Sequence, residues 1–190
     1  LALSFPRYGH PAFAWIALAP LIVVLFDVHR GWPVFRRERA FLLGLVTGVG
    51  YFGGTVYWTG AVVTQFGGLS WPAGVLVAAI LVAYLSLFPA LFALCLGWLG
   101  AKLGRRAILL APAIWVSTEL ARTYFWSGFP WVLLGYSQTP VLPVAQIASV
   151  VGVFGVSALV AMVSAAIAHF VISRSAGSLA ALAGVGAVML

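Results

Sequence analysis

Residues 73–97 read AGVLVAAILVAYLSLFPALFALCLG and contain no Asp, Glu, Lys or Arg. They lie inside a longer block, residues 40–101, that is free of charge throughout, and residues 123–173 form a second such block. A helix needs about 20 consecutive apolar residues to cross a bilayer. Each block can therefore hold at least two membrane passes.

The composition of the whole chain supports this interpretation. Hydrophobic residues make up 64% of the 190 residues and charged residues 7%, whereas soluble domains carry about 25% charged residues. We expect an all-α, polytopic transmembrane helical bundle of about six to seven spans, the first and last incomplete, with residues 1–190 forming one transmembrane domain. The expected segments are a helix remnant at 1–5, spans near 12–27, 40–61, 73–97, 107–124 and 144–171, and a last span from about 178.

The basic residues, which give a net charge of +7, cluster between the expected spans. Such clusters face the cytoplasm in membrane proteins, and their position argues against a nucleic-acid partner. The loops through FGG (66–68) and FPW (129–131) carry no charge and should face the opposite side; Arg7 alone breaks the alternation. The clusters are Arg30, Arg36, Arg37 and Arg39; Lys102, Arg105 and Arg106; and Arg174.

Catalytic and metal-binding residue types are scarce. The single cysteine, Cys95, lies within an expected span, where an apolar setting makes a thiol unreactive. The histidines His10, His29 and His169 lack metal-ligand spacing, and no Gly-rich phosphate-binding motif is present. Covalent catalysis needs a nucleophile near a base, so we expect no catalytic residue, metal or cofactor in this chain.

Two charged residues, Glu119 and Arg122, stand in an otherwise apolar helix. A charge at membrane depth costs about 2.5–3.5 kcal/mol on insertion scales, so it usually faces a partner, a cavity or a site. Residues three apart share one helix face and can pair. Either the pair fastens this helix to its neighbours, or Arg122 meets a lipid phosphate, which guanidinium groups bind through two parallel bonds, while Glu119 holds it.

The segment SGFPWVLLGYSQ, residues 127–138, combines helix breakers with aromatic residues and a polar end. Irregular backbone at membrane depth is tolerated where it is buried in protein or lines a cavity. The segment is therefore either an interfacial or re-entrant element that handles lipid, or a simple outer loop. Together with Glu119 and Arg122, the candidate lipid-binding residues are Phe129, Pro130, Trp131, Tyr136 and Gln138.

The span at 40–61 carries two pairs of glycines four residues apart, Gly44 with Gly48 and Gly50 with Gly54. Small residues at this spacing let helix backbones approach closely in lipid. We predict that these glycines pack against neighbouring helices and have no chemical role.

Several motifs, in this order and spacing, resemble those of the bacterial apolipoprotein N-acyltransferase family. That family moves an acyl chain from a phospholipid, typically phosphatidylethanolamine, to the α-amino group of a diacylglyceryl-cysteine lipoprotein in the bacterial inner membrane. The resemblance implies a Glu–Lys–Cys triad in an extracytoplasmic carbon–nitrogen hydrolase (nitrilase-like) domain, which this chain lacks and to which Cys95 does not correspond. The motifs are YFGGTVYW (51–58), QFGG (65–68), AYLSLFPALFA (83–93), LAPAIWVSTELAR (110–122), SGFPWVLLGYSQ (127–138) and VGVFGVSALVAMVSA (151–165).

The resemblance further implies that Trp131 contacts the lipid substrates, which are a phospholipid acyl donor and a diacylated apolipoprotein acceptor. We expect this chain by itself to be inactive, because it lacks the triad. A non-catalytic membrane anchor of the same fold, serving another lipid-linked enzyme, is an alternative. A transporter bundle is less favoured, because transporters show internal repeats and paired broken helices near the midplane, whereas this sequence has one broken segment near one surface.

Overall fold

The computed structural model describes residues 1–5, 9–26, 36–125 and 128–173. Within these ranges the chain forms helices and their connections and contains no strand, which confirms the all-α prediction. The basic residues Arg7, Arg30 and Arg174 lie outside the described ranges, as does the span expected from about residue 178.

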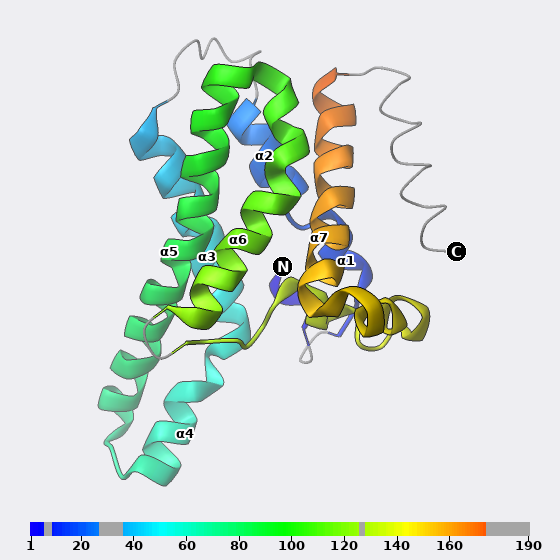
Figure 1. Cartoon of the computed structure of the whole chain (residues 1–190). Coiled ribbons are helices and arrows are strands. Elements are labelled where there is room, and N and C mark those ends of the chain that lie inside the picture. Colours follow the sequence, from blue (N-terminus) through cyan, green and yellow to red (C-terminus); the bar gives the residue numbers. More distant parts are fainter. Residues whose placement is uncertain (6–8, 27–35, 126–127, 174–190) are drawn as a thin grey trace.

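The longer helices run alongside one another as a bundle (Figure 1). Apolar side chains fill its interior, including Leu18, Ile22 and Val160, which are fully buried. Phe92 and Trp115 meet edge to face with ring centroids 5.2 Å apart. The elements are η1 (Ala2–Ser4), α1 (Ala12–Ile16), α2 (Ala19–Phe26), α3 (Arg37–Val56), α4 (Trp58–Gly67), α5 (Trp71–Leu103), η3 (Gly104–Leu110), α6 (Ala111–Tyr124), η4 (Leu134–Gln138) and α7 (Leu142–Ser173).

Three helical stretches of the described chain, Arg37–Val56, Trp71–Tyr124 and Leu142–Ile172, are long and apolar enough to cross a membrane. The second stretch includes α5, η3 and α6, and it folds back on itself after Gly104, whose φ of 60° a glycine adopts without steric cost (Figure 1). A shorter apolar helical stretch covers Ala12–Phe26. These stretches establish a membrane-type helical protein but not the predicted count of six to seven spans.

Close packing of α3 against α5 depends on glycine. A Cβ atom added to Gly48 would lie 2.7 Å from Ser86 Cα, and one added to Gly44 would overlap the Pro89–Ala90 backbone. The predicted packing role of the first glycine pair is therefore confirmed. In the second pair, a Cβ at Gly54 would lie 2.6 Å from Ala2 Cβ in η1, whereas one at Gly50 would meet nothing within 4 Å, so the packing prediction is confirmed for Gly54 and wrong for Gly50.

The predicted span at 40–61 is divided between two helices. Helix α3 ends at Val56, and a separate helix, α4, begins at Trp58. Helix α4 and the first part of α5 form a hairpin that extends beyond the rest of the bundle (Figure 1). Gly60 and Gly74 let its two helices touch, since a Cβ at Gly60 would lie 2.9 Å from Gly74 O. Helix α5 has 33 residues, about 50 Å at 1.5 Å per residue, so it exceeds the roughly 30 Å hydrocarbon core.

The predicted span at 144–171 is bent at Gly152, which has φ 69° and ψ 176° inside α7. Glycine adopts this backbone conformation readily because it lacks a Cβ. The part of α7 before Gly152 turns away from the bundle, whereas the part after it runs alongside α6 (Figure 1). Val150, in the first part, is 85% exposed. The bend therefore separates the outlying, apolar first part of α7 from its packed second part.

Candidate functional site

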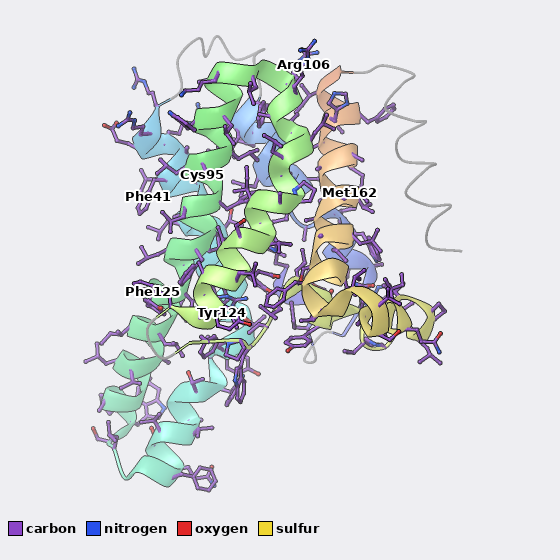
Figure 2. The ribbon with its side chains drawn as sticks, in the orientation of Figure 1. Phe41, Cys95, Arg106, Tyr124, Phe125 and Met162 are labelled. Carbon is purple, nitrogen blue, oxygen red and sulfur yellow. The ribbon has the colours of Figure 1, made fainter. Side chains whose placement is uncertain are left out.

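The candidate site is the segment that joins α6 to η4. It lies at the end of α6 that carries Tyr124 and Phe125, and Arg106 marks the opposite end of the bundle (Figure 2). Gly128, with φ 73°, donates its N–H to Phe125 O at 3.0 Å. Phe129 donates its N–H to Arg122 O at 2.9 Å. These bonds turn the chain back across the end of α6, so the segment is irregular, as predicted.

Arg122 fastens this segment from within. Its side chain is 2% exposed and donates from Nη1 to Trp131 O at 3.0 Å and from Nη2 to Val132 O at 3.3 Å. The guanidinium carbon also lies 5.0 Å from the centre of the Phe52 ring. A guanidinium donates its bonds in a fixed planar fork, so Arg122 sets the positions of two consecutive carbonyls.

Glu119 holds the next part of the segment. Its carboxylate, in a side chain 2% exposed, accepts hydrogen bonds at Oε1 from Trp115 Nε1 at 3.0 Å and from Leu134 N at 2.7 Å. Glu119 and Arg122 do not form the ion pair that their spacing allows. Each one instead binds the backbone of the segment that follows α6. They fasten α6 to this segment at two separate points.

Val132 has an unusual backbone conformation. Its φ of 56° is the only positive value of a non-glycine residue in the described chain, and for a β-branched residue such an angle is a genuine outlier. Left-handed conformations of non-glycine residues cost on the order of 1–3 kcal/mol and persist where their surroundings enforce them. The Val132 carbonyl accepts a hydrogen bond from the Tyr51 hydroxyl in addition to the bond from Arg122. Tyr51 is itself buried, at 2% exposure.

Two exposed tryptophans and the half-buried Phe129 lie close together at the segment. Trp131 is 55% exposed, and its ring centroid is 5.7 Å from that of Trp58 and 6.2 Å from that of Phe129. Trp58 begins α4, and its Nε1 donates to Thr55 O at 3.0 Å. Pro130 is also exposed. We call the rings of Trp58, Phe129 and Trp131 the aromatic platform.

The polar end of the predicted site divides into an exposed and a buried part. Tyr136 is 42% exposed, whereas Gln138 is fully buried. Gln138 Nε2 donates to Pro11 O at 3.1 Å and to Ser137 Oγ at 2.9 Å. Gln138 therefore connects η4 to the turn before α1, and of the two residues Tyr136 alone is open to a ligand.

Sequence reasoning missed three residues of the site, Tyr51, Trp58 and Val132. A signal for Tyr51 existed, because a hydroxyl within a charge-free span needs a hydrogen-bond partner. The positive φ of Val132 has no signal in the sequence. Cys95 is a free, exposed cysteine on α5, away from the segment (Figure 2). Among the described residues, no group of His, Cys, Asp and Glu could hold a metal ion.

Comparison with known proteins gives one consistent result. Residues 1–166 match the family model described as the apolipoprotein N-acyltransferase N-terminal domain. The chain is 41% identical over 143 residues to the apolipoprotein N-acyltransferase of Geobacter metallireducens, covering 75% of this chain and 26% of that protein. It is 39% identical over 137 residues to the apolipoprotein N-acyltransferase of Methylococcus capsulatus, covering 70% of this chain and 26% of that protein. The chain thus spans about a quarter of the length of these curated relatives.

Proposed function

Because the chain belongs to the apolipoprotein N-acyltransferase family, we propose that it is the membrane-embedded part of an enzyme that acylates lipoproteins. The acyl donor is a phospholipid of the phosphatidylethanolamine type, and the acceptor is the N-terminal diacylglyceryl-cysteine of an apolipoprotein. Both substrates reside in the bilayer. The helical stretches that are long and apolar enough to cross a membrane support this proposal, because they suit a chain that lies in the bilayer with these substrates.

The observation that carries this proposal is the aromatic platform. Trp131 is exposed although Arg122 and Tyr51 fix the backbone at and beside it. Tryptophan combines a large apolar surface with a polar N–H, so it suits the boundary between acyl chains and headgroups. Holding a reactant in a fixed orientation can remove several kcal/mol from a reaction barrier. The platform is therefore suited to orienting lipid substrates next to a catalytic group.

The direct lipid contacts in this proposal are the exposed residues Pro130, Trp131 and Tyr136 and the half-buried Phe129. The remaining three candidates, Glu119, Arg122 and Gln138, are buried and bonded within the protein. They support the segment by fixing its backbone and do not reach the lipid themselves. This assignment separates three buried candidate residues from four that are at least partly exposed.

We propose that the end with Arg106 faces the cytoplasm of a bacterial cell and that the platform faces the outside of the inner membrane. Basic residues concentrate on the cytoplasmic side of membrane proteins, and the platform lies at the opposite end (Figures 1 and 2). The carbon–nitrogen hydrolase domain that the family uses for the acyl-thioester chemistry then lies on the platform side. In this arrangement the α4–α5 hairpin, whose helix α5 is longer than the hydrocarbon core, also extends toward that domain.

A single substitution tests the proposal in the full-length protein. Trp131→Ala should lower kcat/KM for acyl transfer from phospholipid by about tenfold or more, equivalent to about 1.4 kcal/mol. Trp98→Ala is the matched control, because Trp98 is 44% exposed and lies on α5 with its ring against Lys102. Membrane insertion should be normal in both variants. Unchanged acyl transfer by Trp131→Ala would remove the platform from the function.

A further inference from the structure

We propose that Tyr51 and Arg122 are positioning residues that hold Val132 in its left-handed conformation and thereby fix the geometry of the aromatic platform. This inference rests on the proposed function, because it concerns how the platform is kept in place. It assigns a role to a tyrosine on α3 and to a strained backbone position in the segment after α6.

Two helices that are distant in sequence meet at one carbonyl. The Tyr51 hydroxyl comes from α3 and Arg122 Nη2 from α6, and both donate to Val132 O. A carbonyl oxygen has two lone pairs, so the two donors use its full capacity. Both donor side chains are buried, which shields these bonds from competition with water.

The backbone on either side of Val132 explains why its conformation matters. On the C-terminal side, Leu134 N donates to Glu119 Oε1 at 2.7 Å and Gly135 N donates to Ser157 Oγ at 2.8 Å, so this side is anchored. On the N-terminal side lies Trp131, whose ring is exposed and whose backbone is held through its carbonyl by Arg122 Nη1. Because Glu119 and Ser157 hold the C-terminal side, relaxation of Val132 to a negative φ would displace Trp131 and break its bond to Arg122. The donors to Val132 O therefore control the position of the Trp131 ring.

Tyr51 also links the two halves of the platform. The hydroxyl bond ties the Trp131–Val132 backbone to α3. Trp58 lies two residues after the last residue of α3, Val56. The ring-centroid distance of 5.7 Å between Trp58 and Trp131 thus depends on the contact that Tyr51 makes. Losing this contact should loosen the platform without removing any of its rings.

The first test is Tyr51→Phe in the full-length protein. The ring and its packing against Phe5 and Phe52 remain, and one donor to Val132 O is lost. Amide hydrogen exchange in residues 128–135 should become about fivefold faster, as expected for loss of one typical hydrogen bond. KM for the phospholipid should rise more than kcat falls, since a loosened binding surface weakens binding. Tyr124→Phe is the control, because Tyr124 is 76% exposed.

The second test uses the strain itself. In the Tyr51→Phe background, Val132→Gly and Val132→Ala both remove the two γ-methyl groups, but glycine, which also lacks Cβ, alone adopts a positive φ without steric cost. The glycine double variant should exchange about fivefold more slowly over residues 128–135 than the alanine double variant. It should also recover a KM closer to that of the native protein. When Tyr51 is present, hydrogen exchange over residues 128–135 should differ less between the Val132→Gly and Val132→Ala single variants.

Outcomes separate this inference from the proposed function. If Trp131→Ala lowers acyl transfer while Tyr51→Phe leaves both exchange and KM unchanged, the positioning role is wrong and the platform stands. Equal behaviour of the glycine and alanine double variants would likewise overturn the inference, because strain at Val132 would then be irrelevant. If Trp131→Ala has no effect on acyl transfer, the proposed function fails, whereas the exchange results still decide whether Tyr51 holds Val132.

Discussion

Replacing Gly48 by alanine should weaken the contact between α3 and α5, although alanine is the better helix former. The new Cβ would lie 2.7 Å from Ser86 Cα and 2.8 Å from Ser86 Cβ. Ordinary van der Waals contact begins near 3.4 Å, so the two helices must separate by about 0.7 Å at this point. Overpacking of this kind typically costs about 1–3 kcal/mol.

Gly50, two residues further along the same helix, supplies the matched control. A Cβ there would meet nothing within 4 Å, so Gly50→Ala should keep the full gain in helix propensity, about 1 kcal/mol. The same gain applies to Gly48→Ala and cancels in the comparison. The difference between the two variants therefore isolates the clash, and we expect Gly48→Ala to be less stable than Gly50→Ala by about 1–3 kcal/mol.

Thermal unfolding of the full-length protein in detergent micelles measures this difference. The expected order of melting temperatures is Gly50→Ala at or above the native protein and Gly48→Ala below it. If Gly48→Ala melts as high as Gly50→Ala, α3 and α5 are not in contact at this position. The inference that glycines at this spacing set the helix distance would then be wrong.

The remaining predictions concern Glu119 and the sidedness of the chain. Glu119→Ala should lower the melting temperature of the full-length protein more than Glu119→Gln, because alanine leaves Trp115 Nε1 and Leu134 N unpaired at a cost of about 1–3 kcal/mol each; equal loss in both variants would contradict this. Cysteines engineered at Gly67 and at Arg37 should react with a membrane-impermeant thiol reagent from opposite sides of the membrane. Labelling from the same side would overturn the proposed topology.

Local properties of the sequence were sufficient to predict the all-α class and the irregular segment that follows α6. The absence of charge over residues 40–101 and 123–173 predicts membrane helices, because such stretches can enter lipid without the cost of burying a charge. The packing of Gly44 and Gly48 followed from their spacing, since residues four apart share a helix face. The breakers in residues 127–138 likewise marked the segment that proved irregular.

The tertiary structure alone decided what the polar residues of this site bind. Spacing on one helix allowed Glu119 and Arg122 to pair, but the segment after α6 brings backbone groups close enough to compete for both. The partnership of Tyr51 with Val132 joins residues 81 positions apart, which no local pattern encodes. Hydrogen bonds and strain depend on where distant parts of the chain meet, whereas hydrophobicity belongs to each residue. The sequence thus determined that this protein enters the membrane, and the fold determined how its aromatic platform is held.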